Sequence, residues 1–203
     1  MDDRVKTILA GLDLWAGWPS ATQRAIVGAA LDSFAERGFH GTSLKHIAQG
    51  SGLSTAALYV HFASKEELLF ALSRRGHALA LDLVRKAAAE SLDVLVRAFT
   101  IWHAEHRTIA RVVQYEQGAL SAEHREEVAA LRRETERVVR ERVEHGMAAG
   151  VFTVPDARAA AAAVLSLGID VARWYSPDGR WTPDELADHY ADLATRMLTA
   201  PAP

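Results

Sequence analysis

The feature that most constrains the fold is the segment of residues 42–67, which reads TSLKHIAQGSGLSTAALYVHFASKEE. Thr42 or Ser43 can cap a first short helix, and the glycine-containing turn at residues 50–52 ends it. Ser54 can then cap a second short helix. Two capped helices of this length, joined by a turn with glycine, predict a helix-turn-helix.

The second of these helices has two distinct faces. Leu58 and Phe62 are four residues apart, so they share the face that can pack on the first helix. Thr55, Ala56 and Tyr59 are expected to point outward. Small and hydroxyl side chains near a helix N-terminus can lie deep in a DNA major groove. The pattern favours a DNA-reading helix, and the alternative is a helix pair that only packs within the protein.

The flanking residues predict two longer helices that support the helix-turn-helix. Residues 20–23 (SATQ) form a capping-box pattern, and the helix that they open is expected to end at Gly38. Ser64 opens another capping box with Lys65 in the first turn, and this helix is expected to run to about Ala88. No flexible linker is visible along it. The helix should therefore connect a small first domain stiffly to a second one.

A family resemblance becomes specific at the same residues. The helix-turn-helix of the TetR family of bacterial transcription regulators contains a recurrent A-G-V-S-x-G-x-L-Y-x-H-F-x-S-K-E-x-L string, and it is similar to IAQGSGLSTAALYVHFASKEELL in this sequence. The resemblance covers about two dozen residues. It implies a double-stranded DNA operator as the partner of residues 20–66.

The resemblance also implies which residues touch DNA. By resemblance these are Thr42, Ser54, Thr55, Ala57, Tyr59, His61 and Lys65, and we also expect Ser43 and Lys45 among the DNA-binding residues. Of these, Tyr59, His61 and Lys65 occupy phosphate-contacting positions of the family. Ala56 stands where the family often has glycine, and Ala57 stands where threonine is common. Few base-reading side chains remain, so the operator sequence stays open.

Composition limits the classes of protein that fit. The chain has 203 residues, of which 49% are hydrophobic, and two linked domains fit this length best. Its formal charge of −3 argues against a nonspecific nucleic-acid binder, so any DNA contact needs a local cationic patch. Proline and glycine are sparse, at 6 and 13 residues, which favours an all-α fold.

The expected domains are a 1–19 extension, a 20–66 DNA-binding domain and a 67–203 helical domain for ligand binding and dimerisation.

Several kinds of site and location are not expected. The chain has no cysteine, which excludes disulfides and thiol chemistry. No apolar run approaches the roughly 20 residues that cross a bilayer, and no cleavable leader pattern follows the N-terminus. We therefore expect a cytoplasmic protein without a membrane partner.

The first 19 residues precede the expected helix-turn-helix domain. Apolar residues recur there at helical spacing: Val5, Ile8, Leu9, Leu12 and Trp15. The spacing predicts a short amphipathic helix that packs on the body of the protein before Pro19 ends it. A packing extension is favoured over a DNA-touching arm, although Arg4 and Lys6 leave the second possibility open.

The last two predicted helices, at about 156–174 and 182–199, suggest a homodimer. Asp156 can cap the first, which carries small residues at 159–163 and Gly168, and small residues let helices approach closely. Thr182 begins a capping box for the second. Broad apolar faces on two terminal helices suit a four-helix dimer interface. The TetR family also commonly dimerises through its last two helices.

Aromatic and hydrogen-bonding residues in the second domain suggest a pocket for a small molecule. The expected effector-binding residues are Phe99, Trp102, His103, His106, Tyr115, Met147 and Trp174, to which the resemblance below adds Arg173. Core packing explains most of the first seven equally well. The segment GIDVARWYSPDGRWTPDELADHYADLATRML is similar to the C-terminal end of TetR regulators of fatty-acid, steroid and acyl-CoA catabolism. This resemblance implies an acyl-CoA or lipid-like effector, with Arg173 near a phosphate or carboxylate.

Other chemistry has little support. His103 and His106 are three residues apart and can share a metal, but no third ligand is evident nearby, so no metal is expected. No nucleophile elbow, phosphate loop or zinc-protease motif is present, and we expect no catalytic residue and no cofactor. The predicted function is a ligand-responsive transcription regulator, a repressor released by its effector. An enzyme and a purely structural helical protein are the alternatives, which specific, salt-sensitive promoter binding would distinguish.

Overall fold

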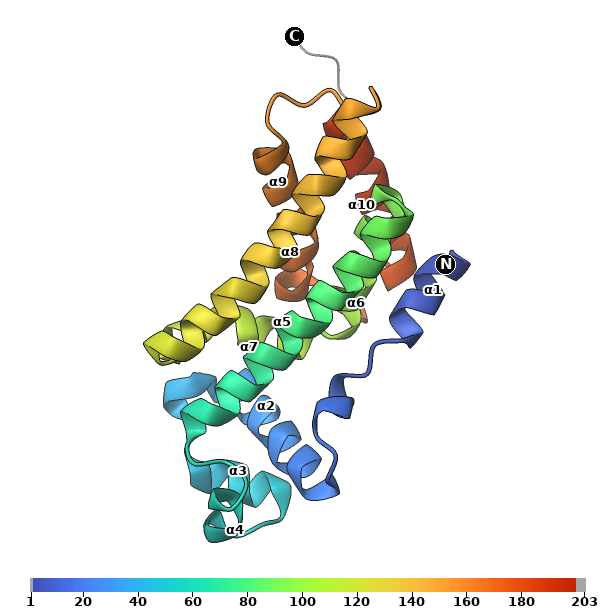
Figure 1. Ribbon diagram of the computed structural model, residues 1–203. Coiled ribbons are helices and arrows are strands. Elements are labelled where there is room, and N and C mark those ends of the chain that lie inside the picture. The colour runs from blue at the N-terminus through green and yellow to red at the C-terminus, as the bar shows by residue number, and fades with distance from the viewer. Residues whose placement is uncertain (1, 200–203) are drawn as a thin grey trace. The chain divides into compact units, whose positions relative to one another are not determined.

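The computed structural model describes residues 2–199, which form helices and connecting turns with no β-strand among them (Figure 1). The prediction of an all-α fold is confirmed. The α-helices are α1 (Asp3–Ala10), α2 (Ala21–Gly41), α3 (Leu44–Ser51), α4 (Thr55–Tyr59), α5 (Lys65–Glu90), α6 (Leu92–Glu105), α7 (Arg107–Tyr115), α8 (Ala122–Ala148), α9 (Ala157–Trp174) and α10 (Pro183–Thr199). Two short 3₁₀ helices, η1 (Leu14–Gly17) and η2 (Gln117–Ala119), lie between them.

Side-chain caps explain where most helices begin. The Ser54 hydroxyl accepts the Ala57 N–H at 3.1 Å, and Asp156 accepts two N–H groups at the start of α9. Thr182 and Glu185 form a complete capping box, in which each side chain accepts the backbone N–H of the other residue. The predicted starts of these three helices are confirmed.

The described residues pack as two compact units. One, here called the HTH unit, consists of Asp13–Ala78 and Thr108–Leu131. The other, here called the C-terminal unit, consists of the residues up to Leu12, Leu79–Arg107 and the residues from Arg132 onward. Because the divisions fall inside α5 and α8, each of these long helices contributes turns to both units.

The HTH unit has its core between α2, α3 and α4, which lie together near the first turn of α5 (Figure 1). Its fully buried side chains include Ile26, Phe34, Ile47, Leu58, Leu68 and Leu69. Gly38 has a φ of 68° and interrupts α2, and Gly52 has a φ of 71° at the end of α3. Glycine adopts this left-handed backbone without a steric penalty, so these two residues set the directions in which the chain leaves α2 and α3.

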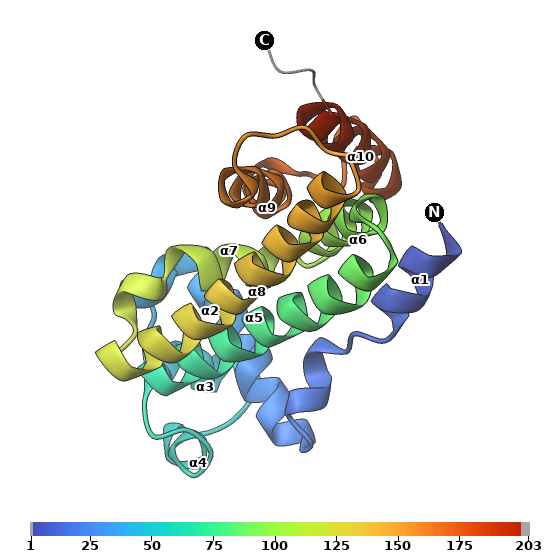
Figure 2. The same ribbon diagram turned by 45° about the horizontal axis from the view of Figure 1, so that its top comes forward.

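The C-terminal unit is built around α6, on which α1, α9 and α10 pack (Figure 2). Most residues of α6 are buried, as its position requires. Gly168 of α9 lies so close to α6 that a Cβ atom there would stand 2.4 Å from Cδ1 of Phe99. Gly168 therefore permits close packing of α9 on α6 inside one protomer, a contact that was not predicted from the sequence.

The N-terminal extension is two elements instead of the single amphipathic helix expected. Gly11 caps the end of α1, and Asp13 caps η1 by accepting the Trp15 N–H at 2.8 Å. Val5 and Ile8 are buried, and α1 packs on α6 within the C-terminal unit. These contacts favour the packing extension over the DNA-touching arm.

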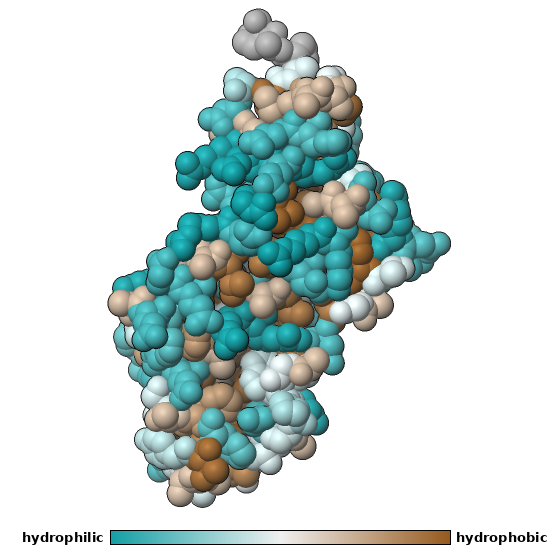
Figure 3. Space-filling view, viewed as in Figure 1, coloured by the Kyte–Doolittle hydropathy of each residue, from teal (hydrophilic) through white to brown (hydrophobic). Residues whose placement is uncertain are grey.

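The visible surface is mostly hydrophilic, with separate patches of hydrophobic residues (Figure 3). Exposed large hydrophobic side chains include Tyr59 and Val60 at the end of α4 and Leu193 and Met197 on α10. Among residues 2–199, no helix is both long enough and apolar enough to cross a membrane.

Candidate DNA-binding surface and effector site

Helix α4 presents the surface that its sequence predicts. Leu58 is completely buried and Phe62 is 7% exposed, whereas Tyr59 is 53% exposed. Ala56 is exposed and Thr55 is partly exposed at the N-terminal end of the helix. The outward face of α4 therefore carries small and hydroxyl groups followed by one phenol.

Helix α3 supplies a second exposed edge of the helix-turn-helix. Ser43 and His46 form a reciprocal cap, in which the Ser43 N–H donates to Nδ1 of His46 at 3.2 Å. Because this Nδ1 accepts a hydrogen bond, a neutral His46 carries its proton on Nε2. Ser43 and Lys45 are exposed beside it, so a cation and a ring N–H are available at the start of α3.

Thr42 lies differently from the sequence expectation. Its side chain is only 3% exposed, and its hydroxyl lies 2.9 Å from the carbonyl oxygen of Ser33 and 2.8 Å from that of Gly38. One hydroxyl hydrogen serves these two acceptors. The side chain of Thr42 therefore faces α2 and is not presented to DNA in this conformation.

Lys65 has a structural role that the sequence did not reveal. Its ammonium donates to the carbonyl oxygens of Phe39 and Thr42, both at 2.6 Å, and lies 4.1 Å from the centre of the Phe39 ring. Burial lowers the pKa of Lys65. Two of its three N–H donors tie the start of α5 to the junction of α2 and α3, which leaves one donor for a phosphate.

The remaining predicted DNA-binding residues lie on the same segment. Ser54 is exposed at the cap of α4, and Ala57 and His61 are partly exposed. The structure thus places the predicted residues, except the side chain of Thr42, on α3 and its cap, α4 and its cap, the turn that follows, and the first residue of α5.

Four of the predicted effector residues lie on α6. Phe99, Trp102 and His103 are 4%, 3% and 6% exposed, and His106 is partly exposed. Nδ1 of His103 donates to the Phe99 carbonyl oxygen at 2.8 Å, because a carbonyl can only accept. Burial lowers the pKa of His103 to about 4. His103 is therefore neutral near pH 7, with Nε2 as a hydrogen-bond acceptor.

The aromatic rings of α6 also pack on one another. Trp102 stacks on His106 with ring centres 5.2 Å apart, and it meets His103 edge to face at 4.9 Å. Among residues 2–199, no three His, Asp or Glu side chains gather in a group suited to a metal ion. The arrangement of these rings is that of a packed core with polar edges.

The other predicted effector residues lie on α7, α8 and α9. Arg173 is exposed and pairs with Asp170 at 2.7 Å, and this pairing lowers the pKa of Asp170. Trp174 is 39% exposed and contacts the rings of other C-terminal residues. Met147 is partly exposed on α8, and Tyr115 belongs to the HTH unit, where it is 59% exposed.

One polar residue of α6 was not predicted from the sequence. Thr100 is completely buried, and its hydroxyl has no hydrogen-bond partner within residues 2–199. A buried hydroxyl without a partner is costly, so Thr100 is a candidate polar contact for an effector. The signal in the sequence was a single threonine within the apolar run AFTIW of residues 98–102.

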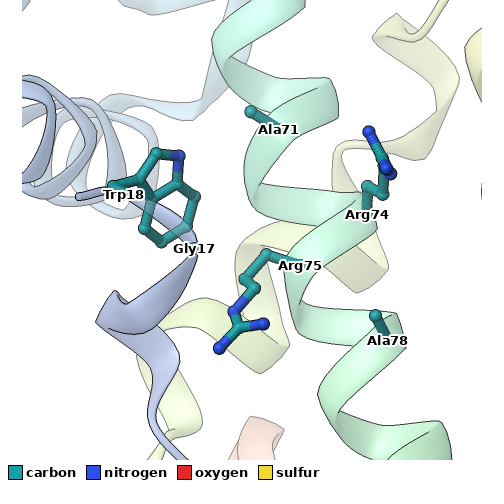
Figure 4. A pocket seen from close by; sticks show the side chains of 6 residues that line it. All are labelled: Gly17, Trp18, Ala71, Arg74, Arg75 and Ala78. Atoms are coloured by element: carbon teal, nitrogen blue, oxygen red, sulfur yellow. The ribbon is translucent and has the colours of Figure 1, made fainter.

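A separate open groove of about 280 Å³ lies in the HTH unit between η1 and α5 (Figure 4). Its lining residues are Gly17, Trp18, Ala71, Arg74, Arg75 and Ala78. Arg75 extends from α5 towards the segment that carries Trp18 and donates to the carbonyl oxygens of Asp13 and Leu14, while Arg74 pairs with Glu127 at 3.1 Å. Both guanidinium groups are thus engaged by the protein, and the groove contains none of the predicted effector residues.

Comparison with curated proteins finds similar regulators. Residues of this chain are 48% identical to the transcriptional regulator RutR of Escherichia coli K12 over 56 residues, which cover 28% of this chain and 26% of RutR. The chain therefore spans about a quarter of RutR. The transcriptional repressor KstR2 of Rhodococcus jostii is 26% identical over 191 residues, which cover 90% of this chain and 93% of KstR2.

Solved structures and family models agree with these relatives. A regulatory protein in the tetR family from Rhodococcus RHA1 superimposes with a TM-score of 0.84 at 38% identity, covering 90% of this chain and all of that one. Residues 26–72 match the model of bacterial regulatory proteins of the tetR family, and residues 85–198 match the tetracyclin repressor-like C-terminal domain. The chain belongs to the TetR family of transcription regulators and contains its helix-turn-helix DNA-binding domain.

Proposed function

We propose that this regulator is a repressor that binds a pseudo-palindromic operator as a homodimer and is released by a small hydrophobic effector. The observation that carries the DNA-binding part is the orientation of α4, which buries Leu58 completely and leaves Tyr59 53% exposed. In this proposal residues 20–66 bind DNA, residues 67–203 bind the effector and make the dimer, and residues 1–19 are an extension.

The dimer proposal rests on exposed apolar side chains of the last two helices. Trp174, Leu193 and Met197 are 39%, 51% and 39% exposed on α9 and α10. A second copy that covers these side chains would remove their apolar surface from water. A two-fold dimer carries two reading helices, which fit successive major grooves when they are about 34–36 Å apart.

The effector proposal rests on α6 and on the C-terminal segment. The unpartnered hydroxyl of Thr100 and the acceptor Nε2 of His103 place two polar groups in a mostly apolar interior. A mostly apolar molecule with one or two hydrogen-bonding groups suits such an interior. The C-terminal resemblance described above points to acyl-CoA or lipid-like compounds, and we propose this class.

The release mechanism uses the two helices that contribute to both units. A ligand that shifts α5 or α8 in the C-terminal unit would move the turns of the same helix in the HTH unit. Linkage requires reciprocity, so an effector that weakens operator binding tenfold is itself bound tenfold more weakly by the operator complex, a coupling of about 1.4 kcal/mol.

Two experiments test the proposal. Footprinting on the promoter region of the protein's own gene should show a protected pseudo-palindrome, and fluorescence anisotropy should show that binding weakens with salt. A thermal-shift screen with acyl-CoA thioesters of increasing chain length should raise the melting temperature, and the stabilising compounds should release the operator. If no promoter fragment is protected, DNA regulation is overturned. If no acyl-CoA stabilises the protein, the effector class is wrong.

A further inference from the structure

The first turn of α5 is bonded to other elements through three consecutive residues. Lys65 holds the carbonyl groups at the junction of α2 and α3, as described above. Glu67 accepts the Ala63 N–H at 2.7 Å and so fixes the loop that follows α4. Glu66 lies between them and binds the beginning of α8.

The contact of Glu66 with α8 is specific in its geometry. Nδ1 of His124 lies 2.8 Å and 3.0 Å from the two carboxylate oxygens, and the Ser121 N–H donates to Oε1 at 2.8 Å. Since a carboxylate only accepts, His124 donates from Nδ1. The side chains of Glu66 and His124 are 24% and 28% exposed, so water screens the pair only partly.

An aromatic contact orients the same histidine. The His124 ring stacks on Phe70 with centres 3.7 Å apart and planes 3° from parallel. Phe70 follows Glu66 by one helical turn, so one stripe of α5 offers both the hydrogen-bond acceptor and the flat surface. Two contacts of different kinds thus fix His124 against α5.

We propose that the Glu66–His124 pair positions the helix-turn-helix for operator binding. The pair fastens the N-terminal end of α8 to the turn that also holds the start of α3 through Lys65. A displacement of α8 would therefore move the first turn of α5, and with it the helix-turn-helix that Lys65 holds. Both are positioning residues, and the inference rests on the proposed binding of an operator.

A second ion pair between the same two helices provides a control. Arg74 and Glu127 lie 3.1 Å apart, but their side chains are 62% and 50% exposed. Exposed pairs contribute little to stability, because water screens the charges and ordering the side chains costs entropy. Glu127→Ala should leave operator affinity within about twofold of the unmodified protein.

Two substitutions at position 124 separate the hydrogen bond from the ring contact. His124→Phe keeps a ring on Phe70 and removes the donor, whereas His124→Asn keeps an N–H donor near the position of Nδ1 and removes the ring. Operator affinity, measured by anisotropy at a temperature where every variant is folded, should fall about three- to tenfold for His124→Phe. His124→Asn should retain most of the operator affinity that His124→Phe loses. The salt slope should stay unchanged, because no phosphate contact is lost.

A double variant tests whether the two residues act together. If they do, Glu66→Ala combined with His124→Phe should bind the operator no more weakly than Glu66→Ala alone. The inference would be overturned if the losses of operator affinity in the two single variants added up in the double variant. It would also be overturned if His124→Phe bound the operator as tightly as the unmodified protein, or if His124→Asn bound it as weakly as His124→Phe. Failure of the unmodified protein to bind any promoter DNA would instead overturn the proposed function, and this inference with it.

Discussion

Gly168 of α9 lies directly against the ring of Phe99 on α6, where a Cβ atom would stand 2.4 Å from Cδ1. Gly168→Ala should therefore force the ring or the helix to move and lower the free energy of unfolding by about 1–3 kcal/mol. Urea unfolding measures the change. Gly118→Ala is the control, because nothing lies within 4 Å of a Cβ there. Equal midpoints and slopes for the two variants would show that α9 can be repacked without strain.

Lys65 and Lys45 should respond differently to alanine. Lys45 is exposed, so Lys45→Ala should weaken binding at all operator sequences and lower the magnitude of the salt slope by about one unit, with little effect on stability. Lys65→Ala should also destabilise the protein by about 1–3 kcal/mol, because two carbonyl groups lose their donor. Calorimetry and salt titrations measure both quantities. An unchanged melting temperature for Lys65→Ala would contradict its role at the α2–α3 junction.

The proposed dimer should be sensitive to charge on α10. Leu193 is 51% exposed in the protomer, and Leu193→Glu would bury a carboxylate between two copies. The dissociation constant of the dimer should rise about tenfold or more, since an unpaired buried charge is costly. Sedimentation at micromolar concentration measures it, with Ala130→Glu on an exposed position of α8 as the control. A monomeric unmodified protein would remove the basis for a two-fold operator.

His103 should make stability depend on pH. Burial lowers its pKa to about 4 from 6.5, so below pH 6.5 the unfolded chain binds a proton that the folded chain does not. The free energy of unfolding should therefore fall as the pH falls from about 6.5 to about 4, by roughly 2 kcal/mol at pH 5 relative to pH 7. His103→Gln should lose this share of the pH dependence in urea unfolding, whereas His145→Gln at an exposed position should keep it. An identical pH profile for His103→Gln would mean that the histidine is not desolvated.

Local patterns in the sequence were sufficient for the helix starts and for the faces of α4. The caps at Ser54, Asp156 and Thr182 join residues two or three positions apart. The burial of Leu58 beside the exposure of Tyr59 follows from helical periodicity. Such features depend on neighbours within about one helical turn, so residue types and spacing predict them well.

Contacts between distant segments were decided only by the tertiary structure. Lys65 reaches carbonyl groups 26 and 23 residues away, and His124 meets Glu66 across 58 residues. The sequence likewise did not show that Tyr115 belongs to the HTH unit and Phe99 to the core of the C-terminal unit. The sequence alone determined which side chains were polar, aromatic or small and which lay on one helix face. Their roles depended on which helix packed opposite, because packing between helices sets which groups lose water and find partners.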